Sequence, residues 1–410
     1  MSISPAPASF VFNRLFIGAL TLMPLLAVIL PRFMAFAPLL LALIGAGCFF
    51  AASPERRAAF SKAPLIISAA IMTLTGLSVL WALDPAIAGD RAVKLVMILI
   101  PGALLLGFHP VLGREALRDF AWVLPWTAIA AAALLIVELY FNAPLYHAIR
   151  GLAVPEEFNL SSLNRAVVCI ILTLPCAAFI VRQSGFTRKK TLVMLGLIAA
   201  GAALILYKTE SQSAQLAAIV GTLFWALHLS RFKATWIVLT ALIAAALFSA
   251  PWLSQFAFKT LAENLHHAPW LQHGYAAERL EIWDYVGRYA LEHPFHGFGI
   301  EATRAVEAFD TAEIYQKGVT ILHPHNFALQ IWIEFGLLGV IPAIAFFGYL
   351  LYRLTLLPLA ASRLGLGVTM ASLSIAATGY GLWQSWWVGE VVLITLFFIL
   401  LLRIHTDKSI

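Results

Sequence analysis

The chain has 410 residues, of which 61% are hydrophobic and only 12% are charged, whereas an ordinary globular protein carries about 25% charged residues. This composition excludes a water-soluble globular fold. The net charge of +6 is not accompanied by a stripe of basic and aromatic residues, so we expect no nucleic-acid partner.

Apolar runs long enough to cross a bilayer recur along the sequence from Phe10 to Leu402. A run of about 17 to 25 apolar residues spans a membrane as a helix, because lipid offers the backbone no other hydrogen-bond partner. The pattern therefore predicts an all-α polytopic membrane protein with about a dozen transmembrane helices. The expected spans are residues 12–30, 34–52, 64–82, 93–108, 120–139, 166–181, 191–207, 214–229, 234–252, 327–350, 364–383 and 388–402.

The first apolar run is expected to be a retained helix, because Pro31 and Arg32 follow it without a clear small-residue cleavage site. The three cysteines, Cys48, Cys169 and Cys176, all lie inside apolar runs. Such positions suit neither a disulfide framework nor a metal site of thiolate ligands. We therefore expect these side chains to pack as small apolar groups.

Lysine and arginine are distributed unevenly between the connections. Alternate connections are basic and, together with Arg14, hold 16 of the 27 Lys and Arg residues. The basic residues of these connections are Arg56, Arg57, Lys62, Arg114, Arg118, Arg182, Arg188, Lys189, Lys190, Arg231, Lys233, Arg353, Arg363, Arg403 and Lys408. By the positive-inside rule, both termini and these connections are expected in the cytoplasm.

The longest connection, from Ser254 to His325, is then expected to face the periplasm. A connection of about 70 residues usually carries function or its own folded structure. Within it, the sequence pattern predicts an amphipathic helix from Ala277 to Leu291, which ends in the turn HPFHGFG. The expected division is transmembrane helices 1–9 in residues 1–253, a periplasmic loop domain in residues 254–325, and transmembrane helices 10–12 in residues 326–410.

The densest polar cluster is the sequence HPHN, which begins at His323 and leads into the tenth span. Asn326, Gln330 and Glu334 follow one another at a spacing of four, so their side chains share one helix face. A carboxylate near membrane depth is costly. Glu334 is therefore expected either to be functional or to hydrogen-bond a neighbouring helix.

A histidine at a water boundary can accept a proton near neutral pH, which suits a general base acting on a sugar hydroxyl. A lone histidine there is more often solvated or capping, but His323 and His325 occur as a pair beside an asparagine after a long outward connection. Metal binding by this pair, with His266 and His267, is the weaker alternative, because no HxxxH or carboxylate-bearing pattern supports it. We expect no metal site.

Arginines are the candidates for binding phosphate, because a guanidinium presents a planar fork of donors. Arg279 has no acidic residue three or four positions away in its predicted helix. Arg288 has Asp284 one turn earlier, which predicts a solvated salt bridge. Arg165 starts the sixth span, where free helix-end amides favour an anion. The alternative is that Arg165 snorkels to the membrane interface.

Three blocks of sequence follow one another between about Lys208 and Val340. The first, TESQSAQLAAIVG, is a short outward turn that opens a span. The second, ERLEIWDYVGRYALEHPFHGFGIEA, joins an arginine-to-tryptophan helix to a His-Pro turn and a Gly-x-Gly. The third is HPHNFALQIWIEFGLLGV. In this order, with the long connection between them, the blocks resemble the O-antigen ligase and polymerase family, whose members use undecaprenyl-pyrophosphate-linked glycans.

The resemblance implies a fold of membrane helices like that of lipid-dependent GT-C type glycosyltransferases, with a periplasmic loop that carries the site. His325 matches the family's essential histidine, with His323 as the second choice. Arg279 matches the loop arginine that engages the pyrophosphate. Because pyrophosphate is already a good leaving group, catalysis needs only a base and cations, and we expect no cofactor, neither a metal nor a nucleotide.

The chain departs from the family at one position of the diphosphate clamp. Family ligases usually place a second arginine in the short turn of the first block, where this chain has Gln212 and Gln215. Lys208 and Arg165 are the nearest possible substitutes.

The resemblance and these residues together predict an O-antigen ligase of the bacterial inner membrane, which transfers glycan with inversion from undecaprenyl pyrophosphate to a lipid A-core sugar hydroxyl. The expected partners are this donor, the lipid A-core acceptor and membrane lipids. An O-antigen or exopolysaccharide polymerase and a protein O-oligosaccharyltransferase share the donor and differ in the acceptor. A lipid or solute transporter is the alternative of another class, but it leaves the long outward connection unexplained.

The topology can be tested by cysteine labelling in intact cells. A membrane-impermeant thiol reagent should label Lys317→Cys without permeabilisation of the inner membrane, because the charge rule places that residue outside. Lys189→Cys, in a basic connection, should be protected. Labelling of Lys317→Cys only after the inner membrane is made permeable to the reagent would overturn this topology.

Overall fold

The computed structural model describes residues 7–155, 157–227, 231–268, 275–306 and 321–406. Within these residues every regular element is a helix, which confirms the predicted all-α class. The chain divides into two compact units, residues 1–69, 97–218 and 385–410 in the first and residues 70–96 and 219–384 in the second. Position 317, chosen for labelling, lies outside the described residues.

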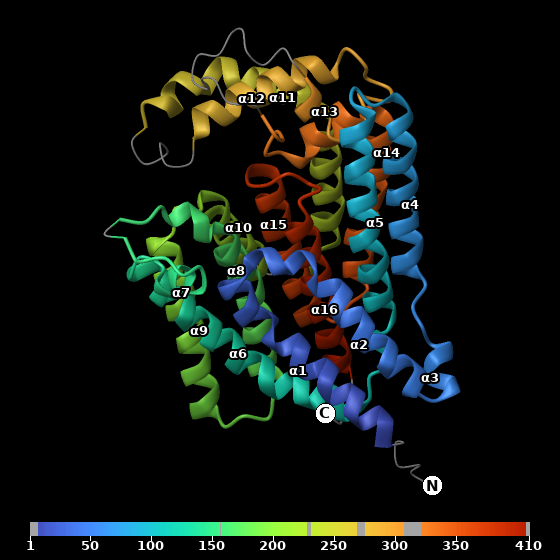
Figure 1. Cartoon of the computed structure of the whole chain (residues 1–410), viewed down its shortest axis with the longest axis vertical. Helices are drawn as coiled ribbons and strands as arrows, with labels where there is room; N and C mark the ends of the chain where they lie inside the picture. Colours follow the sequence, from blue (N-terminus) through green and yellow to red (C-terminus); the bar gives the residue numbers. More distant parts are fainter. Residues whose placement is uncertain (1–6, 156, 228–230, 269–274, 307–320, 407–410) are drawn as a thin grey trace. The chain divides into compact units, whose positions relative to one another are not determined.

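The helices that belong to the first unit are α1 (Pro7–Ile29), α2 (Ala37–Ala51), α3 (Pro54–Ala58), α6 (Arg114–Tyr140), α7 (Pro144–Ile149), α8 (Asn164–Gln183), α9 (Arg188–Lys208) and α16 (Ser385–Thr406) (Figure 1). The second unit holds α11 (Lys233–His266), α12 (Ala276–Ala290), α13 (Ala302–Ala305), α14 (Phe327–Thr355) and α15 (Leu359–Thr378). Residues of α4 (Ala63–Ser78), α5 (Pro85–Gly107) and α10 (Gln212–Ala226) fall in both units.

Ten helical segments among the described residues are long and apolar enough to cross a membrane. They correspond to all the expected spans except 34–52 and 214–229, where α2 and α10 have 15 residues each. The structure therefore confirms a polytopic membrane protein. The three cysteines are free and buried, as expected for small packing residues.

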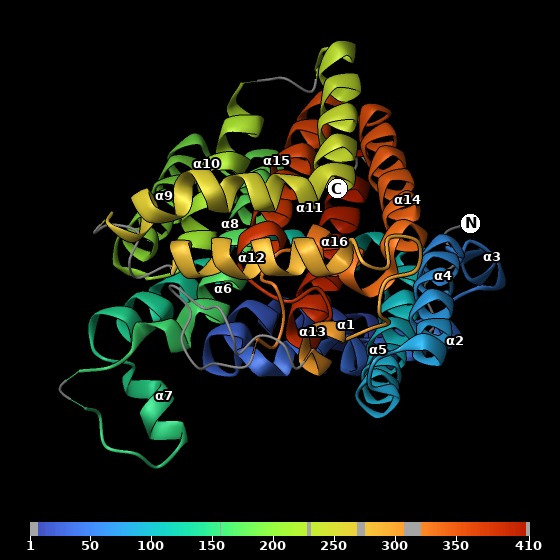
Figure 2. The ribbon, with the colours of Figure 1, turned by 90° about the horizontal axis from the view of Figure 1, so that it is seen from above.

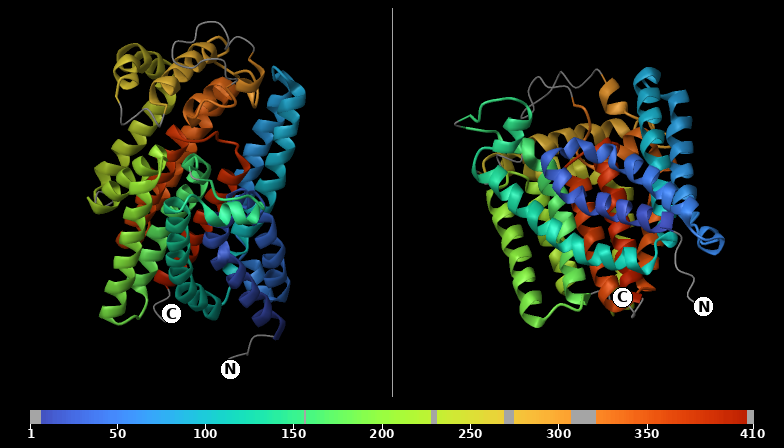
Figure 3. Two further views of the ribbon diagram at one scale, coloured as in Figure 1. Left: turned by 60° about the vertical axis from the view of Figure 1, so that its left-hand side comes forward. Right: turned by 60° about the horizontal axis from the view of Figure 1, so that its bottom comes forward.

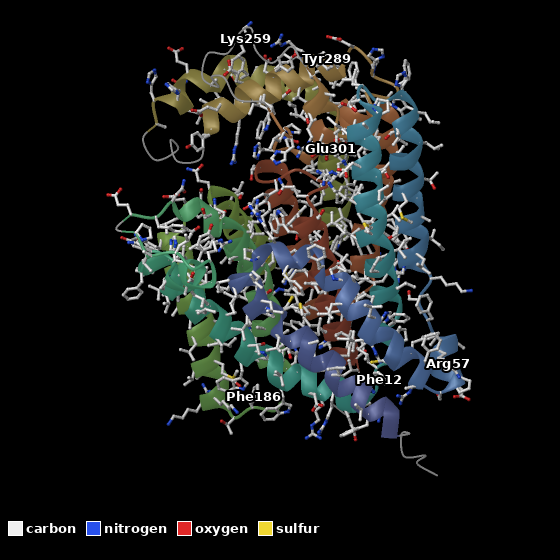
Figure 4. The ribbon with its side chains drawn as sticks, viewed as in Figure 1. Phe12, Arg57, Phe186, Lys259, Tyr289 and Glu301 are labelled. Carbon is white, nitrogen blue, oxygen red and sulfur yellow. The ribbon has the colours of Figure 1, made fainter. Side chains whose placement is uncertain are left out.

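Basic residues gather at one end of the first unit. Arg57 and Phe186 are labelled at the same end as Phe12 of α1 (Figure 4). The Arg56 guanidinium lies beside Gly113, at the start of α6. Lys190 lies 4.5 Å from the ring of Phe186. The start of α1 and the end of α16 also lie at this end (Figures 1 and 3), as the positive-inside rule requires if the end is cytoplasmic.

In the second unit α12 packs lengthwise on the last turns of α11 (Figures 1 and 2). The expected amphipathic helix is thus confirmed as α12. Gly287 permits the close approach, because a Cβ there would meet the carbonyl oxygen of Pro251 at 2.8 Å. The indole nitrogen of Trp332 donates to the Leu247 carbonyl at 2.7 Å and joins α14 to α11. Since α11 runs to His266, the ninth span continues as one helix into the long connection.

The helix α14 is interrupted at Gly336, whose φ of 53° and ψ of −142° are not helical. The turn after α12 supplies the missing partners. The amides of Leu337 and Leu338 donate to the carbonyls of Pro294 and Phe295 at 2.8 and 3.0 Å. Backbone that leaves helical geometry at membrane depth must find such partners in the protein. The turn therefore stabilises the break.

Gly336→Ala should destabilise the protein. An added Cβ would lie 2.5 Å from the Pro294 carbonyl oxygen, at a φ that disfavours side chains, and strain of this kind costs about 1–3 kcal/mol. We expect a lower midpoint of thermal unfolding in detergent. The matched control is Gly196→Ala in α9, where an added Cβ meets nothing within 4 Å. An equal midpoint for the two variants would show that the break tolerates a side chain.

Candidate functional site

The sequence HPHN forms the entry to α14. Asn326 is the N-cap residue, and its side-chain oxygen accepts from the amides of Ala328 and Leu329 at 3.0 and 3.2 Å. Asparagine is a preferred residue at this position because it satisfies free helix-end amides. His325 precedes the cap with φ +55°, a backbone conformation uncommon outside glycine. The cap and the strained residue fix where the His325 side chain points.

His325 is oriented by the end of α15. Its Nδ1 lies 2.6 Å from the carbonyl oxygen of Gly379, and since a carbonyl only accepts, Nδ1 carries the proton. The Nε2 atom then keeps a lone pair. Burial lowers the pKa of His325 to about 3, with smaller contributions from the charges of His323 and Arg279. The imidazole is therefore neutral at physiological pH.

His323 lies against His325, with ring centroids 4.2 Å apart and planes nearly perpendicular. Its Nε2 pairs with the Gln384 amide nitrogen at 2.6 Å. Burial, with smaller contributions from the charges of Arg304, Arg279 and Arg91, lowers its pKa to about 4. The Nε2 lone pair that a base needs is thus already engaged in His323, whereas in His325 the engaged atom is Nδ1.

Arg279 projects from α12 to the same end of α15. Its Nη1 donates to the carbonyl of Thr378, one of the carbonyls that a helix C-terminus leaves free and that favour a cation. Burial lowers its pKa, although Tyr380 and Glu278 oppose the shift. The indole of Trp283, on the same helix, donates to the Pro324 carbonyl at 2.7 Å. Helix α12 and the end of α15 therefore hold Arg279 and His325 together.

The predicted polar stripe of α14 is a hydrogen-bonded network. The Gln330 amide nitrogen donates to Glu334 at 2.9 Å, and the Gln330 oxygen accepts from the Leu382 amide at 2.7 Å. The second oxygen of Glu334 accepts from the Trp383 indole at 2.5 Å. Glu334 is completely buried and also accepts from the Glu301 amide at 3.1 Å. It therefore bonds neighbouring segments, which is one of the two roles expected for it.

Three charged residues that sequence reasoning did not select lie near the histidines. Arg91, Glu301 and Arg304 form one ion-paired group, and both arginines lower the pKa of His323. Arg91 lies near the start of α5, far from the motifs in sequence, and its only local signal is a charge beside an apolar run. Glu301 and Arg304 lie within five residues after the Gly-x-Gly turn. Their place next to this motif is the feature of the sequence that could have identified them.

Arg165 and Lys208 belong to the first unit. Arg165 lies in the first turn of α8, 5.9 Å from the Trp386 ring. Lys208 is the last residue of α9, 5.9 Å from the Tyr140 ring. Gln215 donates to the carbonyls of Leu206 and Thr209 at 2.9 and 3.3 Å. This glutamine therefore satisfies the end of α9, and the role of Arg165 and Lys208 in binding donor stays a prediction.

Arg288 pairs with Asp284 at 2.8 Å and its side chain is 60% exposed. The predicted salt bridge is confirmed, but only its arginine is solvated, because the Asp284 side chain is 13% exposed. His266 and His267 lie side by side at the end of α11, with ring centroids 5.4 Å apart. Across the part of the chain that the structure describes, no group of three or more His, Cys, Asp or Glu side chains is arranged to hold a metal ion.

The sequence profile of the O-antigen ligase family matches residues 195–344, a segment that contains α12, the HPHN motif and the break in α14. Residues 195–344 are similar to the O-antigen ligase domain. This confirms the resemblance found in the three sequence blocks.

Individual proteins of Rickettsia match part of the same chain. A protein of Rickettsia prowazekii, provisionally named a polysaccharide ligase, is 33% identical over 28% of this chain and 29% of its own length. A protein of Rickettsia conorii with the same provisional name is 29% identical over 31% of this chain and 32% of its own. The match thus spans about a third of the length of the curated relatives.

Proposed function

We propose that this protein is a polysaccharide ligase of the bacterial inner membrane, which transfers a glycan from undecaprenyl pyrophosphate to a sugar hydroxyl of lipid A-core at the periplasmic face. One observation carries the proposal. A neutral histidine, His325, presents Nε2 as a base beside the guanidinium of Arg279, and both side chains are held at the end of α15. The O-antigen ligase profile over the same residues supports the assignment.

The transfer is a single displacement at the anomeric carbon. The acceptor oxygen attacks, and its proton passes to Nε2 of His325 as the new glycosidic bond forms. The bond from the anomeric carbon to the pyrophosphate oxygen breaks, and undecaprenyl pyrophosphate leaves with the electron pair. Arg279 stabilises the charge of this leaving group. One displacement inverts the anomeric centre, and neither a metal nor a nucleotide is required.

The donor itself should improve the base. A pKa of about 3 for His325 makes a weak proton acceptor near neutral pH. Arg279 contributes to that low value, and a bound pyrophosphate would neutralise the guanidinium. The pKa of His325 should therefore rise when donor binds. The charges that hold the leaving group and the basicity of the histidine are thus coupled.

The proposed ligase differs from two related activities only in the acceptor. A polymerase and a protein O-oligosaccharyltransferase use the same donor, so the site described above fits all three. The deciding experiment is the lipopolysaccharide ladder of a deletion strain. If the protein is a ligase, the deletion strain should lose the lipopolysaccharide ladder and retain the lipid-linked polymer. A ladder shortened to a single repeat would instead identify a polymerase.

Arg279→Gln should abolish most transfer, whereas Arg288→Gln should have little effect. A charge-assisted hydrogen bond contributes about 1.5–3 kcal/mol, which corresponds to at least about tenfold in rate. Arg288 is exposed and already paired with Asp284. The measurement is transfer from lipid-linked donor by purified protein at equal concentration. A larger loss of transfer rate for Arg288→Gln than for Arg279→Gln would show that Arg279 is not the arginine that binds the donor.

Lys208→Ala and Arg165→Ala belong in the same assay. We propose that one of these residues supplies a second cation for the donor, and its removal should raise the KM for donor. If neither variant changes KM or kcat, the second cation is elsewhere in the chain.

His325→Ala should lower the transfer rate about 100- to 10,000-fold, as expected for loss of a general base, while donor binding is largely retained. His323→Ala should be milder, because the Nε2 atom of His323 is engaged with Gln384. Purified protein, donor and acceptor are followed by gel shift in the presence of a chelator. A near-normal rate for His325→Ala would reject this assignment, and loss of activity with chelator alone would revive the metal alternative.

The pH profile of the wild type gives a second test of the same histidine. Because the pKa of His325 is lowered from 6.5 to about 3, the free enzyme keeps its base form as the pH falls through 6.5. We expect kcat/KM, which reports the free enzyme, to stay flat from about pH 8 to about pH 5. The acid limb of kcat should lie at higher pH than that of kcat/KM, since bound donor raises this pKa. An acid limb near 6.5 in kcat/KM would contradict the buried, neutral base.

A further inference from the structure

Glu301, which is labelled in Figure 4, is a buried carboxylate. It lies between two guanidinium groups. Its Oε1 lies 2.6 Å from Nε of Arg91, and its Oε2 pairs with Nε of Arg304. The Glu301 side chain is 6% exposed, while those of Arg91 and Arg304 are 16% and 32% exposed. One carboxylate thus forms ion pairs with two arginines from different elements, and the group keeps a net charge of +1.

The backbone at Glu301 is fixed by buried partners on both sides. Its φ of +63° is uncommon for a residue other than glycine. Its amide donates to Glu334 at 3.1 Å, and the preceding amide of Ile300 donates to the Ser78 hydroxyl at 3.2 Å. Strained conformations persist where the surroundings enforce them, and they concentrate at functional sites.

This charged group adjoins the histidines. The Nη1 of Arg91 donates to the Trp383 carbonyl at 3.0 Å, and the next residue, Gln384, bonds His323. The hydroxyl of Thr303, beside Arg304, donates to the Leu322 carbonyl at 3.4 Å, directly before His323. The electrostatic effect of both arginines on His323 agrees with this placement.

We propose that Glu301 is a positioning residue, which pairs Arg91 with Arg304 to form a second anion-binding site beside His323 for a phosphate group of the lipid-linked donor. The inference rests on the proposed function. It places a pair of cations within the unit that holds Arg279. The strained Gly-x-Gly-Ile-Glu turn then serves to position Glu301 between them.

The carboxylate is needed because two guanidiniums at a buried site repel each other and are free to reorient. Because its two oxygens lie in ion-pair contact with the Nε atoms of Arg91 and Arg304, Glu301 offsets one charge and holds the two side chains at one place. Arg304, the more exposed of the pair, remains accessible to a phosphate oxygen. A guanidinium binds phosphate best when its orientation is fixed in advance.

The test measures inorganic pyrophosphate as a competitor of the donor, together with the KM for donor. Glu301→Gln keeps the size of the side chain and removes its charge. Glu301→Gln and Arg304→Gln should each weaken pyrophosphate inhibition and raise donor KM by about tenfold, with a smaller change in kcat. The double variant should be close to Arg304→Gln alone, because Glu301 acts through the arginine. Glu301→Asp should restore part of the loss.

Asp284→Asn, Arg288→Gln and their double variant are the matched controls, because they alter a carboxylate–arginine pair of the same unit in which the carboxylate is likewise buried and the arginine is exposed. They should leave pyrophosphate inhibition unchanged. Equal inhibition of wild type and Arg304→Gln by pyrophosphate would overturn the inference, and so would additive losses in the Glu301/Arg304 double variant. If Glu301→Gln does not fold, Arg304→Gln alone decides.

This result is separable from the proposed function. An active wild type with unaltered Arg304→Gln would reject the second anion site only. A wild type without transfer would reject the ligase function. In that case pyrophosphate binding is measured as the rise in thermal stability that it causes in detergent. Comparison of the wild type with Arg304→Gln then tests the anion site.

Discussion

The interruption of α14 at Gly336 is the constraint on which the second unit depends. A helix broken at membrane depth leaves amides and carbonyls that lipid cannot satisfy. Here the turn that follows α12 fills the gap: the carbonyls of Pro294 and Phe295 accept amides from beyond the break, and the amides of Phe298 and Gly299 donate to carbonyls before it. This exchange fastens the long connection to the membrane helix. The same contact brings Glu301 to Glu334 and so fixes the charged group beside the histidines.

A second constraint is the accumulation of positive charge in a site with little water. Arg279, Arg91 and Arg304 all act on the pKa of His323, and burial acts in the same direction. Such a site is costly when empty, because buried cations repel one another. It becomes favourable when an anion with two or more charges enters. The electrostatics therefore favour an anionic ligand, and under the proposed function the strength of the base depends on the presence of that ligand.

Much of this architecture follows from local sequence. The apolar runs specify the membrane helices, because length and composition alone decide whether a segment can span lipid. The amphipathic period of α12 is also a local feature, and it lies where the sequence predicts it. Asn326 was expected in the polar stripe of the helix, and the structure makes it the N-cap of α14. The pairing of Arg288 with Asp284 is also local, because residues four positions apart are neighbours on one helix face. Both His325 and Arg279 were identified by resemblance, His325 also as one of a histidine pair beside an asparagine and Arg279 also by its lack of a local acidic partner. The two side chains meet at one helix end.

The sequence by itself determined the fold class, the candidate base and the candidate arginine, since these depend on periodicity, hydropathy and motif. Only the tertiary structure decided which nitrogen of His325 is free, because that depends on a carbonyl 54 residues away. It likewise decided that Glu334 bonds Trp383 and that Arg91 joins Glu301 and Arg304. Hydrogen bonds and ion pairs between distant segments leave no periodic trace in a single sequence, so the partners of a buried charge emerge only when the chain is folded.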